Sequence, residues 1–231
     1  MTTQQIYHPE VDHPPRLFEH GLPLDQELTP GDLDRLAADP FWEYELVGGT
    51  LLVRSRHHQL TYTDLESFPR FPNWKYELLE GTLMVSRNAP GRWHQCCAGS
   101  LYMLFRIACP PDLQAMIAPF DFRPVTTSTM QPDVLIASRP VGLEWLAHAP
   151  VLVVEVLSPG TKVYDRTMKR AKYQALGIEF YWIVDPAGPS IEVLRLVDGV
   201  YEIAAKGEAG QVFEVSEPVA LRFDPRDLLD D

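Results

Sequence analysis

Long apolar runs, a cysteine framework and a positive net charge are all missing from this sequence of 231 residues. No apolar segment approaches the roughly 20 residues that cross a bilayer as a helix. The N-terminus lacks the basic and apolar regions of a secretory signal. Only three cysteines occur, which excludes a disulfide scaffold and favours a reducing compartment. We therefore expect a cytoplasmic protein with no membrane partner.

The net charge of −12 argues against a surface that grips nucleic acid everywhere, because non-specific affinity comes from phosphate neutralisation. The charge is uneven, however. Residues 161–172, TKVYDRTMKRAK, carry five basic side chains against one acid, Asp165. This segment is either a solvated helix face or a local basic patch that steers an anionic substrate.

An internal repeat occupies the N-terminal third of the chain. WEYELVGGTLLV at 42–53 and WKYELLEGTLMV at 74–85 match at eight of twelve positions. Each copy predicts a short helix that begins at a threonine cap, followed by two strands that turn at Gly48-Gly49 or Glu80-Gly81. Two copies are too few for a solenoid. We expect residues 28–59 to extend a sheet edge or to cover a subunit interface.

Downstream of the repeat, helical and strand patterns alternate as in a single mixed α/β sheet domain. The patterns predict helices over 91–108, 141–147 and 161–176, strands over 115–123, 132–137, 151–157 and 180–186, and a hairpin that turns at Asp198-Gly199. We divide the chain into a loosely ordered segment 1–25, a duplicated helix-hairpin extension 26–59 and a main domain 60–231.

Two acids stand out because each lies in an apolar strand. Glu155 interrupts VLVVEVL at 151–157 near the strand's carboxyl end, and Asp133 begins an earlier strand in QPDVLIA. If these strands are neighbours, the two carboxylates converge, and a shared cation such as Mg²⁺ or Mn²⁺ would relieve their repulsion. The alternatives are that Asp133 is a turn residue and that Glu155 pairs with a lysine or arginine.

The order of motifs resembles the Uma2 family of endonucleases, which belongs to the PD-(D/E)XK superfamily with the restriction-endonuclease-like fold. The resemblance covers roughly residues 60–200 and rests on YELLEGTL, WHQ, QPDVLIA, VVEVLSPGT and DRTMKRAKYQALGIEFYWIVDP. It implies that Asp133 and Glu155 hold the divalent ion and that Glu77 is an additional acid in the metal shell. His94 matches the first residue of the family's HQ pair and is an accessory candidate.

The lysine of the superfamily motif is absent, because Leu157 stands where the lysine would be. Uma2-like proteins carry a lysine in the following helix instead, and Lys169 occupies that position. Lys169 is therefore the third catalytic candidate, and Asp165 is an accessory candidate. Alternatively, Asp165 and Lys169 form a surface ion pair at i, i+4. We expect Tyr173 and Tyr181 to be core or hydrogen-bonding residues.

The resemblance implies a Mg²⁺- or Mn²⁺-dependent endonuclease that hydrolyses phosphodiester bonds of nucleic acid. DNA is favoured over RNA as the substrate, and a homodimer is an arrangement that nucleases cutting duplexes often adopt. Two other functions stay open. One is a catalytically inactive module on the same fold that binds nucleic acid or protein, and the other is a phosphodiesterase for small substrates.

Overall fold

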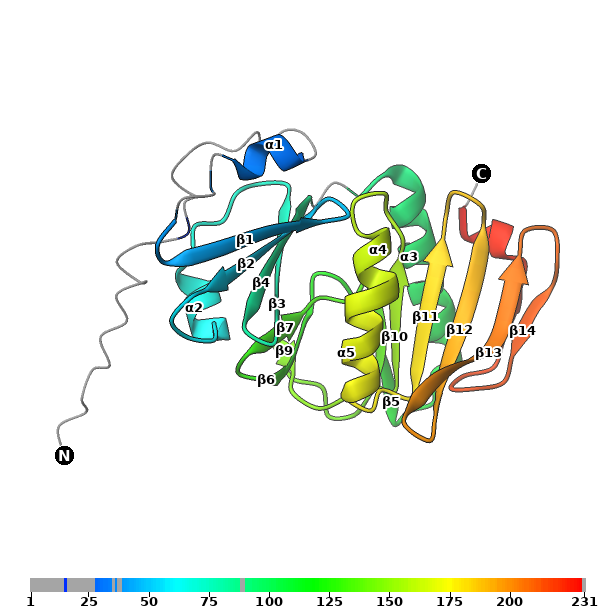
Figure 1. Ribbon diagram of the computed structural model, residues 1–231. Helices are drawn as coiled ribbons and strands as arrows, with labels where there is room; N and C mark the ends of the chain where they lie inside the picture. Colours follow the sequence, from blue (N-terminus) through cyan, green and yellow to red (C-terminus); the bar gives the residue numbers. More distant parts are fainter. Residues whose placement is uncertain (1–14, 16–27, 35, 37–38, 88–89, 230–231) are drawn as a thin grey trace, which may run out of the picture. The chain divides into compact units, whose positions relative to one another are not determined.

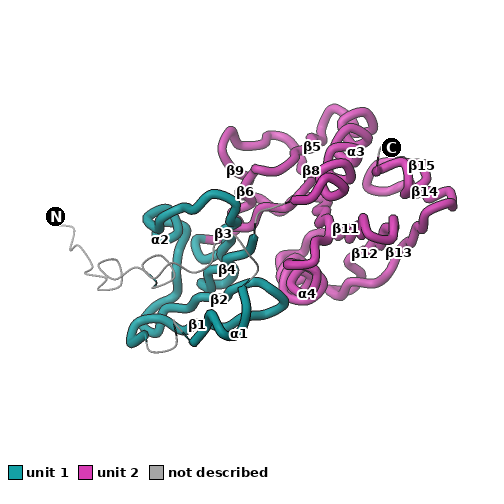
Figure 2. Tube along the Cα trace, turned by 90° about the horizontal axis from the view of Figure 1, so that it is seen from above, with its two compact units in different colours: residues 1–88, 126–128 teal, residues 89–125, 129–231 magenta. Residues whose placement is uncertain are grey.

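The computed structural model describes residues 15, 28–34, 36, 39–87 and 90–229. The expected loosely ordered segment 1–25 lies outside the described residues except for Pro15. The chain packs into two compact units, one with residues up to 88 and 126–128 and the other with 89–125 and 129–231 (Figure 2). In the described part of the chain, no helix is both long and apolar enough to cross a membrane.

Both copies of the repeat lie in the first unit, and each folds into a short helix followed by a hairpin (Figure 1). The strands join in the antiparallel order β1-β2-β4-β3, so the first copy extends the sheet at β4. Apolar side chains from both copies form one core. The elements are α1 (Pro30–Leu33), β1 (Trp42–Val47), β2 (Thr50–Ser55), α2 (Tyr62–Ser67), β3 (Trp74–Leu79) and β4 (Thr82–Arg87).

Local sequence signals account for these elements. The backbone N–H of Thr61 donates to the Asp64 carboxylate at 2.7 Å, which caps α2, and the first copy repeats this bond at 2.8 Å. Both hairpins turn at residue pairs with positive φ, Gly48-Gly49 and Glu80-Gly81. Positive φ at both central residues matches the twist of the flanking strands in a two-residue hairpin.

A six-stranded sheet with helices on both faces forms the centre of the second unit. Its order is β13-β12-β11-β10-β8-β5, with a single parallel pair, β10 and β11, among these neighbours. The strands are β5 (Leu113–Ile117), β8 (Val134–Ser138), β10 (Leu152–Val156), β11 (Phe180–Asp185), β12 (Ser190–Val197) and β13 (Val200–Glu208). The crossover from β10 to β11 is helical, as parallel neighbours require.

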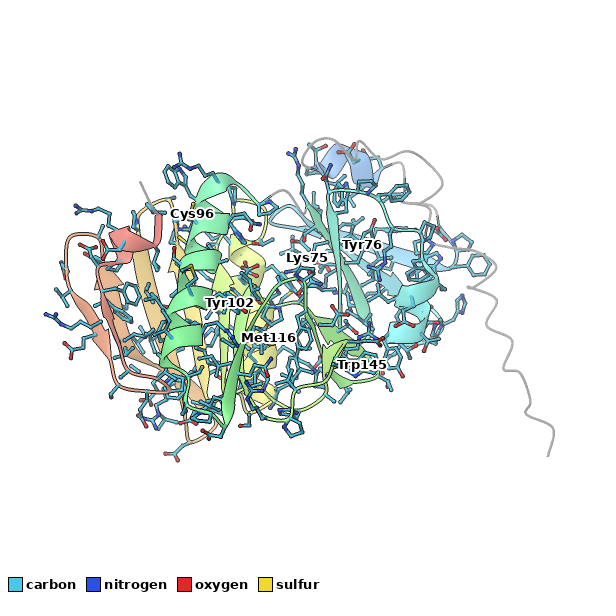
Figure 3. The ribbon with its side chains drawn as sticks, turned by 180° about the vertical axis from the view of Figure 1, so that it is seen from behind. Lys75, Tyr76, Cys96, Tyr102, Met116 and Trp145 are labelled. Carbon is cyan, nitrogen blue, oxygen red and sulfur yellow. The ribbon has the colours of Figure 1, made fainter. Side chains whose placement is uncertain are left out.

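Residue parity along β10 separates the two faces of the sheet. Val154 and Val156 pack into the large apolar core together with Leu101 and Phe105 of α3 (Arg92–Ala108). Glu155 points to the opposite face, where it contacts Lys169 of the crossover helix. Figure 1 shows this helix on one face of the sheet. That helix consists of α4 (Lys162–Tyr164), a π-helical turn η2 (Asp165–Lys169) and α5 (Arg170–Ala175). In Figure 3, Cys96 and Tyr102 mark α3 and Met116 marks β5.

Two of the predicted elements are wrong. The strand expected over 115–123 is interrupted at Pro119 and gives β5 and β6 (Asp121–Val125), because proline cannot donate to a strand ladder. The helix expected over 141–147 is absent. Instead, β9 (Trp145–Leu146) pairs with β6 in parallel, and this long-range pairing overrides the local helical pattern. Residues 128–130 form β7, and the C-terminal part adds β14 (Phe213–Val215), β15 (Leu221–Phe223) and η3 (Pro225–Leu229).

Candidate active site

The strands that carry the two candidate acids are neighbours, as the sequence predicts. β8 and β10 are antiparallel, and Val134 pairs with Val154. Asp133 and Glu155 therefore come next at the same end of this strand pair. The Asp133 Oδ2 atom accepts a hydrogen bond from the backbone N–H of Val156 at 2.7 Å. This bond ties the first carboxylate to the strand that holds the second one.

Glu155 is buried among hydrogen-bond donors from the crossover helix. The Lys169 ammonium lies 2.9 Å from Glu155 Oε1, and the Tyr173 hydroxyl donates to the same oxygen at 2.7 Å. Glu155 and Lys169 are each only 2% exposed. A buried carboxylate without such partners would be strongly unfavourable. The pairing of Glu155 with a lysine, one of the alternatives that the sequence left open, is therefore present, and the three groups compensate one another inside the protein.

The π-helical turn η2 places Lys169 and Asp165 together. The Lys169 ammonium lies 3.5 Å from Asp165 Oδ1 and 5.4 Å from the centre of the Tyr164 ring. The Tyr181 hydroxyl, from β11, donates to the backbone carbonyl of Asp165 at 2.9 Å. Single π-helical turns occur frequently at functional sites. Here the turn brings one ammonium group against two carboxylates.

The interpretation of Asp165 and Lys169 as a surface ion pair is wrong, because both side chains are 2% exposed. Burial and the nearby charges also affect Tyr181. Desolvation raises the pKa of its hydroxyl well above the usual value, and the Glu155 and Asp165 carboxylates raise it further while Lys169 lowers it. Tyr181 is therefore a neutral hydrogen-bond donor at physiological pH.

His94 lies beside the other acid. It is in the first turn of α3, and its Nε2 atom is 3.2 Å from Asp133 Oδ2. Its Nδ1 atom is buried and has no hydrogen-bond partner among the described residues. A histidine in this place can position or neutralise the Asp133 carboxylate. The structure thus brings the accessory candidate His94 to Asp133.

Glu77 lies in β3 of the first unit, where its side chain is buried and the Lys75 ammonium is 3.6 Å from its Oε1 atom. Lys75 and Tyr76, its neighbours along β3, are labelled in Figure 3. Glu45 holds the equivalent position in the first repeat but is half exposed and pairs with Arg54 at 3.0 Å. Of the two repeat copies, the second thus buries its glutamate.

The donor set at the strand ends fits a hard divalent cation. Within the described ranges, no cluster of three or more His, Cys, Asp or Glu side chains is placed to hold a metal ion. Mg²⁺, however, usually keeps several waters and binds through one or two carboxylates together with substrate phosphates. Asp133 and Glu155 lie at the same end of the neighbouring strands β8 and β10, and they supply two carboxylates of the kind that such an ion binds.

Most basic side chains of residues 161–172 have acidic or carbonyl partners. Lys162 pairs with Asp185 at 2.9 Å and Arg166 with Glu192 at 3.6 Å, while Arg170 donates to the Tyr201 carbonyl at 3.2 Å. Lys162 is exposed, as expected for a solvated helix face, whereas Lys169 is buried. The segment therefore presents less unpaired positive charge than its composition suggests.

The hydrogen bond from Tyr173 to Glu155 is a contact that the sequence did not predict. The sequence predicts a core or hydrogen-bonding role for Tyr173, which its bond to Glu155 confirms, but it does not indicate which group Tyr173 contacts. Its position four residues after Lys169 was the available signal, because residues at i and i+4 lie on one helix face.

Comparison with known proteins matches residues 59–226 to the Uma2 family, described as "Putative restriction endonuclease". A similar solved structure is that of a "putative nuclease belonging to DUF820" from Anabaena variabilis, with a TM-score of 0.57 and 18% sequence identity. The similarity covers 74% of this chain and 97% of that one, and it supports the mixed α/β fold. A comparison with curated proteins gave no match.

Proposed function

This chain belongs to the Uma2 family, and from that membership we propose that it is a nuclease that uses a divalent metal ion to hydrolyse phosphodiester bonds. The observation that carries the proposal is the contact of 2.9 Å between Lys169 Nζ and Glu155 Oε1. It supplies an ammonium group at the second acid although Leu157 stands at the motif lysine's position. An acid pair with a lysine is the set that this chemistry needs.

Asp133 and Glu155 would hold Mg²⁺ or Mn²⁺, and Glu77 is proposed as the additional acid from the family resemblance. When bound, such an ion polarises the scissile phosphate and lowers the pKa of a coordinated water. Lys169 would then stabilise the negative charge that develops on the phosphate oxygens. Asp165 would hold the Lys169 ammonium in place, and His94 would hold the Asp133 carboxylate in place.

The proposed substrate is nucleic acid, with DNA ahead of RNA. The printed description of the family, a restriction endonuclease, favours DNA. Pairing of two chains is proposed as well, because one active site cuts one strand of a duplex at a time. The three cysteines are unpaired, which supports the cytoplasm as the compartment.

A cleavage assay tests the proposal. Supercoiled plasmid, single-stranded DNA and RNA are incubated with the protein and Mg²⁺, Mn²⁺ or EDTA. We expect cleavage that EDTA and Glu155→Gln each abolish. The control is Glu214→Gln, which removes a glutamate that is 69% exposed in β14 and should leave cleavage unchanged.

Other outcomes would favour the other functions. Salt-sensitive binding of nucleic acid without cleavage by the wild type would indicate an inactive binding module. Hydrolysis of a small phosphodiester such as bis(p-nitrophenyl) phosphate, without nucleic-acid binding, would indicate a small-substrate enzyme. The net charge of −12 makes this second outcome worth measuring.

A further inference from the structure

Two donors converge on a single oxygen of Glu155. The Lys169 ammonium approaches Oε1 at 2.9 Å, and the Tyr173 hydroxyl approaches the same atom at 2.7 Å. Tyr173 is fully buried and its ring packs edge-on against Tyr181 at 5.2 Å between centres. The tyrosine is thus fixed on two sides. Its hydroxyl has a defined direction toward the carboxylate.

If the proposed function holds, the Lys169 ammonium interacts both with Glu155 and with a phosphate oxygen of the substrate. In the present structure its ammonium is engaged by Glu155 and by Asp165 at 3.5 Å. A phosphate oxygen that approaches the ammonium competes with Glu155 for its three N–H groups, which weakens the contact with Oε1. A buried carboxylate oxygen that loses a charged donor is destabilised. A second donor on that oxygen removes this obstacle.

We propose that Tyr173 is a positioning residue that keeps Glu155 Oε1 hydrogen-bonded and oriented while Lys169 turns to the substrate. This inference rests on the proposed function and deepens it. It assigns to the crossover helix both the catalytic ammonium and, one turn later, the hydroxyl that stays bonded to Glu155 when the ammonium moves. Donors that orient ligating carboxylates commonly change metal affinity or activity by about 10- to 100-fold when removed.

Tyr201 provides a matched control. Its hydroxyl donates to the backbone carbonyl of Ile178 at 2.8 Å, and its side chain is 3% exposed. Tyr201→Phe and Tyr173→Phe therefore each remove one buried tyrosine hydrogen bond, but only Tyr173→Phe removes a bond to a proposed metal ligand. Any difference between the two variants beyond thermal stability reports on Glu155.

The experiment measures three quantities for wild type, Tyr173→Phe, Tyr201→Phe and Glu155→Gln. These are the Mn²⁺ dissociation constant by electron paramagnetic resonance, kcat and KM for the cleaved nucleic acid, and Tm. For Tyr173→Phe we expect Mn²⁺ affinity and kcat each to fall by about 10-fold or more, with KM unchanged. Tyr201→Phe should show a similar shift in Tm and neither of the other effects.

The outcomes separate this inference from the proposed function. Cleavage by wild type with Tyr173→Phe indistinguishable from Tyr201→Phe overturns the role of Tyr173 and leaves the nuclease intact. Binding of Mn²⁺ that Glu155→Gln abolishes and Tyr173→Phe weakens, without cleavage of any substrate, supports the positioning role and overturns the nuclease. A wild type that neither binds Mn²⁺ nor cleaves overturns both.

Discussion

Lys169 Nζ lies 2.9 Å from Glu155 Oε1, and the two residues are each 2% exposed. They are fourteen positions apart in the sequence, on a strand and on the helix that follows it. The pair therefore depends on how β10 and the crossover helix pack. Both its stability and its proposed chemistry follow from that packing.

The first prediction concerns the stability of this pair. Lys169→Met leaves Glu155 buried without its cation, so we expect a loss of about 3–5 kcal/mol in the free energy of unfolding. Glu155→Gln combined with Lys169→Met should recover only part of that loss, because Asp165, which is also 2% exposed, still loses its contact with the Lys169 ammonium. Urea unfolding of the full chain measures both. Equal stability of Lys169→Met and wild type would mean that the pair does not form.

The second prediction concerns Asp133. Its Oδ2 atom accepts the Val156 N–H at 2.7 Å, and an asparagine oxygen can accept the same bond. We expect Asp133→Asn to keep the wild-type stability within about 1 kcal/mol, whereas Asp133→Ala loses about 1–3 kcal/mol by leaving that N–H unsatisfied.

Both substitutions at Asp133 should abolish Mn²⁺ binding, because each removes the charge of the carboxylate. Calorimetric titration with Mn²⁺ and urea unfolding provide the two measurements. Retention of Mn²⁺ affinity by Asp133→Asn would remove Asp133 from the metal site.

The third prediction concerns alkaline pH. Burial, with smaller effects of Cys96 and Asp185, raises the pKa of the Cys97 thiol to about 12 from 9.0. Between these values the unfolded chain loses the proton that the folded chain keeps. The free energy of unfolding should therefore fall with rising pH, by about 1.4 kcal/mol per pH unit for this group.

Cys97→Ala tests whether Cys97 causes this fall in the free energy of unfolding. The stabilising contribution of the Cys97 proton is complete below pH 9 and is lost as the pH rises toward 12, so the variant should lose less stability than wild type across this window. Urea unfolding at pH 8, 9, 10 and 11 gives the comparison. Parallel curves for the two proteins would contradict the raised pKa of Cys97.

The fourth prediction concerns two hairpin glycines. Gly81 and Gly199 both have positive φ, but a Cβ atom at Gly81 would lie 2.8 Å from the Gln59 Cβ, whereas nothing lies within 4 Å of one at Gly199. Gly199→Ala should cost about 1 kcal/mol from backbone strain alone. Gly81→Ala should cost about 1–3 kcal/mol more, because the added methyl group is overpacked.

Thermal unfolding of the two variants at one pH measures this difference. Equal losses would show that the contact with Gln59 relaxes freely.

Local patterns predicted much of the fold. The helix that begins after Gly91 and ends before Cys109, the two repeat hairpins and the strands around Glu155 and Trp182 all follow from caps, glycine turns and apolar runs. The structure of residues 141–147 could not be predicted from local patterns. Their pattern suits a helix, but Trp145 pairs with Asp121 in a sheet, and such pairing with a distant segment leaves no local signal.

Candidate site residues were recognisable by type and by family resemblance, and their contacts were not. A single acid in an apolar strand needs a partner that offsets the cost of burying its charge. The sequence therefore identifies Glu155 as a candidate site residue. The compensating groups lie on another element. The i, i+4 spacing predicts the pairing of Asp165 with Lys169 but not its burial, and nothing in the sequence assigns Tyr173 to Glu155.

Local sequence signals account for the capped helices, for the turns with positive φ and for the alternation that places Glu155 opposite Val154 and Val156. The sequence also determines which residues carry charge in apolar surroundings. Three further facts depend on long-range packing: β8 lies beside β10, Lys169 is buried against Glu155 and Asp165, and Tyr173 contacts the same Glu155 oxygen as Lys169. The contacts of Glu155 with Lys169 and Tyr173 join residues fourteen and eighteen positions apart in the chain, and their energy comes from desolvation and packing that exist only once the sheet and its crossover helix are assembled.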